Sequence, residues 1–309
     1  MKLRIHNPCN EQTRYYRNYN LFWDELTDKL KEKYDVVENR YFEFANSRGF
    51  EININSSKLI LMECEYVIEN LDNGNFYILS VADNLSQCVL SERNNSKLKK
   101  VLLSQFVDYD VKHHTSNNYK KYSPWIYFQS NLTDLEPHYK NRLINSDYVN
   151  KLCFWGTTSE RPILKHFNSD ILEGPNYIGG SEEYFSNLIK YSVALSISGV
   201  GQLCYRDIEC FALGVPLLKF KFQGSLSEPL IPNYHYISVE GSETLPKHNG
   251  VHTDRLGDKS HASMIENRFN EVINDKEFLN FISKNARDYY NKYLNSKNRV
   301  ERTLKLLEL

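Results

Sequence analysis

The sequence lacks the long apolar runs that membrane-spanning and secreted proteins carry. Nowhere in its 309 residues do about 18 apolar residues follow one another, as a helix that crosses a bilayer requires. The first residues, MKLRIHNPCN, also contain no apolar segment of the kind found in signal peptides. We therefore expect a soluble, cytoplasmic protein without a transmembrane segment.

Cysteine is scarce, and an excess of charge of either sign is absent. The six cysteines are scattered, with no CxxC pair and no histidine at metal-ligand spacing, so neither a disulfide framework nor a zinc site is expected. Lys and Arg together number 38 against 39 Asp and Glu. This balance argues against nucleic acid as a partner, but it permits a local basic site for a small anion.

Short apolar runs alternate with helical patterns, which favours an α/β fold built on parallel strands. In the first half, strands are expected at residues 3–6, 35–37, 59–62, 76–82 and 125–128, with a helix or strand at 97–106. In the second half, strands are expected at 151–155, 193–197 and 215–220, and helices at 161–167, 182–190, 205–213 and across 262–309. Residues 223–260 look irregular. We expect two Rossmann-like doubly wound domains, with ligands bound in the cleft between them.

The stretch from Ser198 to Pro216 carries the clearest chemical pattern. An apolar strand ends at Ser198, and Gly199 and Gly201 then let the backbone approach a ligand near a helix start that suits an anion. Arg206 and Glu209 share one face of that helix. The arginine offers forked donors to a phosphate and the glutamate accepts from a ribose diol, which fits a nucleoside diphosphate. The alternative is a solvated Arg–Glu pair beside an ordinary turn.

Residues 150–220 resemble the donor-binding segment of glycosyltransferases with the GT-B fold, and the exostosin-like pattern most of all. The similarity rests on Arg206-Asp-Ile-Glu209, on Ala212-Leu-Gly214-Val-Pro216 after it, and on the upstream run from Phe154 to Arg161. The resemblance implies an acceptor-binding domain at 1–148, a nucleotide-sugar domain at 149–290, and a C-terminal helix at 291–309 that returns to the first domain. Besides Ser198, Gly199, Gly201, Arg206 and Glu209, the donor-binding residues would be Thr157, Thr158, Arg161 and Lys165.

The implied activity is transfer of a sugar from a nucleotide-sugar donor to a hydroxyl of a glycan acceptor. Many retaining members of the family carry a second glutamate where this chain has Gly201, so we expect an inverting enzyme that needs neither metal nor cofactor. Inversion requires a general base. Asp83, directly after the strand at 76–82, is the first candidate, with a helix cap as its alternative role. His6 is the second, with a packing role as its alternative. Weaker candidates near the reactants are His113, His114, His235, Tyr236 and His252, the last three on an expected mobile surface.

Two other functions remain open on the sequence. Asp108-Tyr109-Asp110 follows an apolar run, and such a pair of aspartates holds a divalent cation in metal-dependent glycosyltransferases of the other common fold. The second alternative is a non-catalytic protein that binds glycans or nucleotides on the same scaffold, with tyrosines and tryptophans stacking on sugars.

Overall fold

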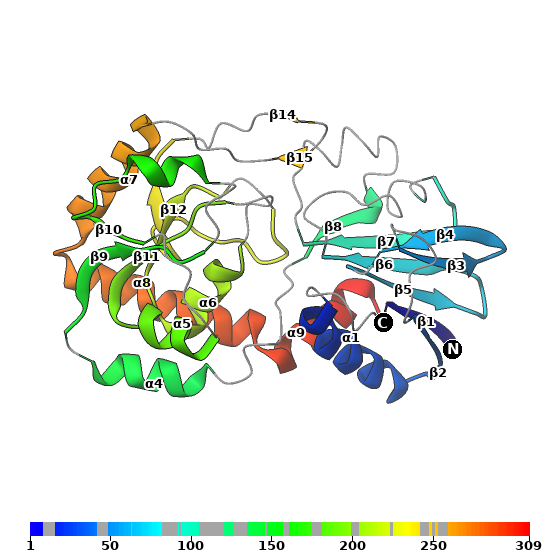
Figure 1. The fold of residues 1–309 in the computed structure, drawn as a ribbon. Coiled ribbons are helices and arrows are strands. Elements are labelled where there is room, and N and C mark those ends of the chain that lie inside the picture. Colours follow the sequence, from blue (N-terminus) through cyan, green and yellow to red (C-terminus); the bar gives the residue numbers. More distant parts are fainter. Residues whose placement is uncertain are drawn as a thin grey trace. The chain divides into compact units, whose positions relative to one another are not determined.

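The chain forms two compact units, each of mixed α/β structure (Figure 1). Unit 1 comprises Met1–Asn131, Gly224–Glu228 and Ser296–Leu309, and unit 2 comprises Leu132–Gln223 and Pro229–Asn295. The computed structural model describes residues 1–8, 16–41, 49–62, 64–81, 92, 94–104, 120–125, 135–145, 147–156, 161–174, 181–198, 204–222, 225–241, 247–248, 251–252 and 259–309. The acceptor and donor roles expected for the two domains stay predictions.

Unit 1 is built on a six-stranded sheet in the order β2-β1-β5-β6-β7-β8. Its strands are β1 (Lys2–Pro8), β2 (Asp35–Tyr41), β5 (Glu65–Asn70), β6 (Phe76–Ser80), β7 (Leu98–Leu103) and β8 (Tyr122–Pro124). The segment 97–106, for which the sequence left helix and strand open, therefore contains a strand. A hairpin of β3 (Phe50–Ile54) and β4 (Ser57–Leu61) shares one apolar core with this sheet.

The predicted parallel strands make up only part of the sheet of unit 1, where β1 pairs with β2, and β7 with β6 and β8, in parallel. Strand β5 runs antiparallel to both β1 and β6, with Glu65 opposite Ser80. Only residues 71–75 join β5 to β6, and so short a connection permits only an antiparallel pair. Strand β5 lacks an alternating pattern in which polar residues face solvent, because both of its glutamates, Glu65 and Glu69, are buried here beside apolar neighbours.

The last helix of the chain belongs to unit 1. Helices α1 (Tyr16–Lys31) and α9 (Ser296–Leu307) share a second apolar core with the sheet. Trp125, at the end of β8, donates its indole N–H to the Thr303 hydroxyl at 3.0 Å, and Arg299 pairs with Glu25 of α1 at 2.8 Å. The C-terminal segment is thus fixed to the first helix of the chain by both apolar and polar contacts.

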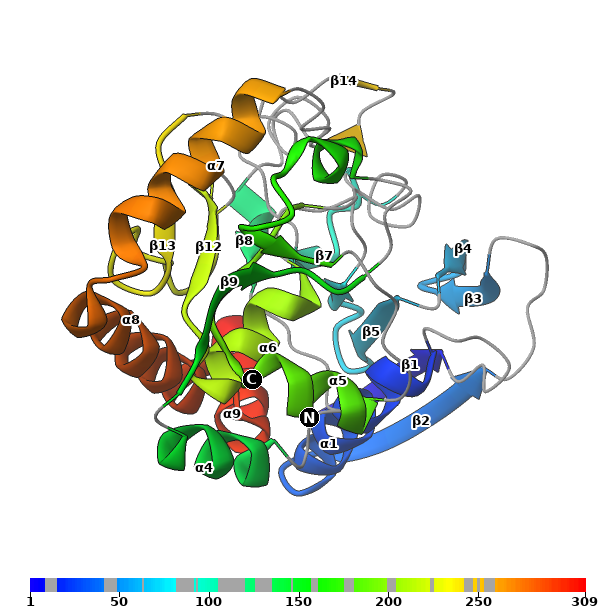
Figure 2. The same cartoon turned by 60° about the vertical axis from the view of Figure 1, so that its left-hand side comes forward.

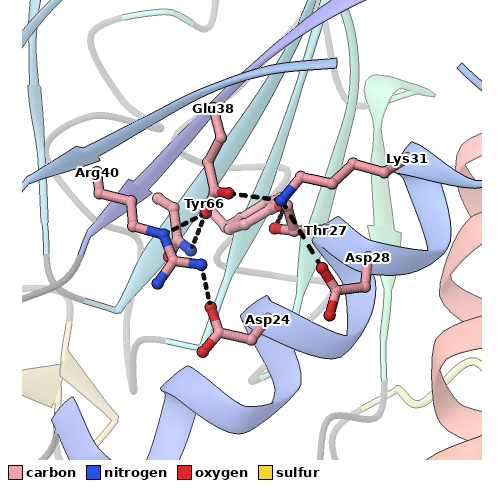
Figure 3. A network of polar contacts seen from close by, with 8 residues as sticks. Asp24, Thr27, Asp28, Lys31, Glu38, Arg40 and Tyr66 are labelled. Atoms are coloured by element: carbon pink, nitrogen blue, oxygen red, sulfur yellow. Dashed lines mark hydrogen bonds and ion pairs between the residues drawn. The ribbon is translucent and has the colours of Figure 1, made fainter. Parts of the chain in front are cut away.

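Charged side chains connect β2, an edge strand of this sheet, to α1 (Figure 3). Arg40 donates from Nε to Glu38 at 2.7 Å and from Nη2 to Asp24 at 2.9 Å, while Lys31 Nζ donates to Glu38 at 2.9 Å. Partly exposed ion pairs contribute at most about 1 kcal/mol each. These charged side chains also line β2, and charge along an edge strand disfavours pairing with another chain.

Unit 2 contains a wholly parallel five-stranded sheet in the order β10-β9-β11-β12-β13. Its strands are β9 (Val149–Cys153), β10 (Leu172–Glu173), β11 (Tyr191–Leu195), β12 (Leu217–Phe220) and β13 (Ile237–Val239). Helix α7 (Lys259–Val272) and the 3-10 turn η3 (Pro162–His166) cover one face, and α5 (Ser181–Leu188) and α6 (Tyr205–Leu213) lie on the other (Figure 2). Helices α4 (Glu136–Ile144) and α8 (Lys276–Tyr289) pack along α6.

Local sequence signals explain most of unit 2. The predicted helix at 205–213 is confirmed as α6, and Gly214 ends it with a φ of 62°, a left-handed conformation that favours glycine. The segment 223–260 is less irregular than predicted, since β13 adds a strand to the sheet and β14 (Lys247–His248) pairs with β15 (Val251–His252). A π-helical turn, η4 (Tyr290–Leu294), follows α8.

Candidate functional site

The strand order of unit 2 itself marks a binding position. The chain passes from β9 to β10 on one side, then returns to β11 on the other side of β9. At such a switch point the connections diverge beyond the carboxyl ends of the two central strands, and ligands of parallel α/β sheets bind there. The described residues at these ends are Phe154-Trp155-Gly156 after β9 and Ser196-Ile197-Ser198 after β11.

Arg206, in the first turn of α6, connects that helix to the loop after β9. Its Nη2 donates a hydrogen bond to the main-chain carbonyl of Trp155, and its guanidinium carbon lies 4.1 Å from the centre of the Phe154 ring. The side chain is only 9% exposed. Arg206 thus lies at the carboxyl end of the sheet with most of its side chain covered, and its role in binding a donor stays a prediction.

Among the residues that the structure describes, none forms an ion pair with Arg206. Within the described part of the chain, no Asp or Glu oxygen lies within ion-pair distance of its guanidinium. Burial works against its charge, yet Tyr184, Cys204 and Glu209 act in the other direction and its pKa is raised, so the group stays charged. Because a buried charge without a partner is costly, the arrangement favours an anion beside it.

Arg142, a second buried arginine of unit 2, has a structural role and serves as a comparison for Arg206. Arg142 of α4 is 5% exposed and donates to the carbonyls of Gly214, Ile189 and Tyr191 at 2.7–2.9 Å. These three acceptors engage three of its five N–H donors. The described residues give Arg206 one acceptor, so most of its donor fork is available for a ligand.

Arg161 approaches the switch point from the opposite side. It precedes η3, and its Nε donates to the carbonyl of Ile197, after β11, at 3.1 Å. Its guanidinium carbon lies 5.6 Å from the same Phe154 ring that Arg206 covers. The position of Arg206 explains why residue 156 is a glycine, because a Cβ there would lie 2.7 Å from Nη2 of Arg206. The glycine thus leaves room for the guanidinium.

Glu209 lies one turn after Arg206 and is held by a tyrosine. The hydroxyl of Tyr184, on α5, donates to Oε2 of Glu209 at 2.9 Å. Burial raises the pKa of Glu209, although the Tyr184 hydrogen bond and the charge of Arg206 oppose that effect. One carboxylate oxygen is thereby oriented by the protein, and no described residue donates to the other, which can accept from a ligand hydroxyl.

A buried polar cluster next to these arginines escaped sequence reasoning. Asp207 is 0% exposed, and its carboxylate accepts from Lys219 Nζ at 2.6 Å, from the Ser196 hydroxyl, and from the Cys204 main-chain N–H at 3.1 Å. On the sequence alone, Asp207 is indistinguishable from the acidic residues that are common in the first turn of a helix. Lys219, inside the apolar run VPLLKF, was the one signal in the sequence for a buried charge.

Several predicted site residues fall outside the residues that the structure describes. They are Asp83, Thr157, Thr158, Gly199 and Gly201, together with the weaker candidates His113 and His114 and the alternative metal ligands Asp108 and Asp110. Their roles stay predictions. Of the remaining donor-binding candidates, Ser198 is buried directly after β11, and Lys165 is exposed on η3.

Two residues that the sequence placed on a mobile surface are instead buried. Tyr236 is 0% exposed, and its hydroxyl accepts from the Phe222 main-chain N–H at 3.0 Å. His235 is 8% exposed, and its Nδ1 accepts from the Ile231 main-chain N–H at 2.9 Å. The His235 side chain closes a local turn and the Tyr236 hydroxyl bonds a residue 14 positions away, so the surface prediction is wrong for both. Of His252 only the backbone, in β15, is described.

His6 lies within β1 of unit 1 and is 1% exposed. Its Nδ1 is 2.8 Å from the Tyr41 hydroxyl, and its Nε2 is 3.6 Å from a carboxylate oxygen of Glu69. Burial, followed by the charge of Arg4, lowers its pKa to about 4, so the ring is neutral at pH 7. A neutral imidazole has the right protonation state for a base, but its burial favours the packing role. Its role as a base stays a prediction.

Comparisons with known proteins leave this geometry as the main guide to function. No family model matches the chain, and no curated protein matches it. Among the described residues, no helix has the length and apolar character to cross a membrane. The same part of the chain contains no group of three His, Cys, Asp or Glu side chains arranged to hold a metal ion.

Proposed function

We propose that unit 2 binds the diphosphate of a nucleotide sugar at its switch point, and that the protein is a glycosyltransferase of the GT-B type. The observation that carries this proposal is the buried guanidinium of Arg206, which lies at the carboxyl end of a parallel sheet and to which the described residues offer one hydrogen-bond acceptor and no carboxylate. The resemblance of residues 150–220 to the donor-binding segment of that family also supports it.

The geometry matches the needs of the reaction. The acceptor oxygen would attack the anomeric carbon, a base would take the hydroxyl proton, and the bond from that carbon to the diphosphate would break. Negative charge then grows on the leaving diphosphate, where fixed positive groups stabilise it. Arg206 and Arg161, which share the Phe154 ring, supply those groups, and Glu209 would accept from the ribose. In this scheme Arg206 and Arg161 stabilise the leaving diphosphate, as a divalent metal ion does in metal-dependent glycosyltransferases.

A thermal-shift screen tests the proposal and identifies the base. Ligands that bind the native state raise the melting temperature with the logarithm of ligand concentration over the dissociation constant. We expect at least one of UDP, GDP, CDP and dTDP to raise it, and the matching nucleoside to raise it far less. Release of nucleoside diphosphate from the matching nucleotide sugars, measured with and without EDTA, then tests turnover and metal independence.

The outcomes separate the alternatives. If none of the diphosphates raises the melting temperature at millimolar concentration, the phosphate site is wrong. If one binds but no nucleotide sugar is consumed with any glycan acceptor tried, a non-catalytic nucleotide-binding protein is the better interpretation. If EDTA abolishes turnover and Mn²⁺ or Mg²⁺ restores it, the metal-dependent alternative replaces the proposed one.

A further inference from the structure

Three donors from three parts of unit 2 converge on the carboxylate of Asp207. Lys219 comes from β12, Ser196 follows β11, and Cys204 precedes α6. Lys219 and Asp207 are 2% and 0% exposed in their side chains, so their ion pair at 2.6 Å is buried. A buried ion pair stabilises a fold no more than a well-packed apolar pair of the same size. Its presence here therefore calls for an explanation other than stability.

The explanation lies in the position of Asp207 directly after Arg206. Neighbouring residues of an α-helix point about 100° apart, since a turn takes about 3.6 residues. Asp207 turns toward β11 and β12, and Arg206 turns toward the loop after β9. Cys204 joins these groups, because its main-chain N–H donates to Asp207 and its thiol donates to the Ile197 carbonyl, which also accepts from Arg161. An unneutralised carboxylate there would attract Arg206 and repel an incoming phosphate.

We propose that Lys219 is a positioning residue for the phosphate site: it neutralises and holds the carboxylate of Asp207, so that the charge of Arg206 remains available to the ligand. The inference rests on the proposed function, because it concerns the same anion site. It assigns Lys219 an effect on phosphate affinity although the lysine need not touch the ligand.

The test compares charge variants by calorimetry, with UDP, or the nucleoside diphosphate that gives the largest thermal shift, as probe and inorganic pyrophosphate as a second one. In Lys219→Met the carboxylate of Asp207 loses its counter-charge, and we expect affinity for both probes to fall at least tenfold. Adding Asp207→Asn removes the negative charge, while the amide oxygen can accept from the Cys204 main-chain N–H and the amide N–H can donate to the Ser196 hydroxyl. The double variant should therefore bind within about threefold of wild type. Lys151→Met, which breaks the partly exposed Lys151–Glu173 pair on β9, is the control and should bind normally.

Each result either supports or overturns the role proposed for Lys219. A folded Lys219→Met variant with wild-type affinity overturns the inference, and so does a folded double variant that binds as weakly as the single one. If Lys219→Met does not fold, the double variant is measured alone, since both charges of the buried ion pair are removed in it. Affinity within about threefold of wild type then supports the inference, and weaker binding overturns it. A wild-type protein that binds neither probe contradicts the proposed function itself, and the inference falls with it.

Discussion

At the scale of the residue, the site depends on how one arginine is buried. Arg206 contacts the Phe154 ring and the Trp155 carbonyl, and no carboxylate of the described residues meets it. The sequence predicted the residue and its place at the end of the sheet. It could not predict the direction of the side chain, because Arg206 and Asp207 are both polar and only the fold decides which one faces β12.

Gly156→Ala tests the space that this arginine occupies. The new Cβ would lie 2.7 Å from Nη2 of Arg206, closer than real Cβ contacts come, so the guanidinium must move. We expect the affinity for a nucleoside diphosphate to fall roughly tenfold, the equivalent of about 1.4 kcal/mol. Calorimetry measures the change, and the melting temperature should stay near that of wild type. Unchanged affinity would show that the position of Arg206 does not matter for binding.

His6 leads to a prediction about pH. Its pKa is about 4 in the folded protein and about 6.5 in an unfolded chain, so the folded state binds the proton less readily. Its contribution to stability is complete above about pH 6.5 and is lost as the pH falls toward 4. Between pH 7.5 and pH 5.0 the free energy of unfolding should drop by about 2 kcal/mol from this residue.

Urea denaturation at the two pH values measures that drop. His6→Gln, which does not titrate, should show a smaller decrease than wild type. His235, whose pKa burial also lowers to about 4, adds a decrease of the same sign, so His235→Gln serves as the matched variant in unit 2. If wild type and His6→Gln lose the same stability, His6 is accessible to protons in the folded state and the packing role is wrong.

At the scale of the element, α9 is the segment whose position owes most to tertiary contacts. Its sequence predicts an amphipathic helix, and its apolar residues Val300, Leu304 and Leu307 enter the core of unit 1. The hydrogen bond from Trp125 to Thr303 joins residues that are 178 apart in the chain. No local pattern reveals such a contact, whereas the boundaries of α6 follow from a first-turn acid and a terminal glycine.

Thr303→Val tests the attachment of α9. The substitution keeps the shape of the side chain but leaves the buried indole N–H of Trp125 without its acceptor, which costs about 1–3 kcal/mol. We expect the free energy of unfolding, followed by tryptophan fluorescence in urea, to fall by that amount. Lys305→Ala, on an exposed position of the same helix, is the control and should change it by less than about 0.5 kcal/mol. Equal stability of Thr303→Val and wild type would contradict the role of this hydrogen bond.

At the scale of the whole molecule, the chain combines two sheets of different character. The alternation of strands and helices predicted parallel sheets, and this prediction is confirmed for unit 2. It holds for only part of the sheet of unit 1, where the short turn after β5 forces an antiparallel pair. The switch point of unit 2 follows from strand order, which depends on long-range pairing and cannot be obtained from local patterns. The proposed glycosyltransferase function depends on this switch point and on the resemblance around it.

The central claim is that the buried charge of Arg206 binds a diphosphate, and calorimetry on two matched variants tests it most directly. Arg206→Ala removes a guanidinium that donates to the Trp155 carbonyl and covers Phe154. Arg287→Ala removes one that is equally buried, donates to the Ala212 carbonyl and covers Tyr139, but pairs with Glu136. We predict similar losses of stability, and at least a 30-fold loss of nucleoside-diphosphate affinity in Arg206→Ala alone, as expected for about 2 kcal/mol. Equal affinity in the two variants would contradict the account.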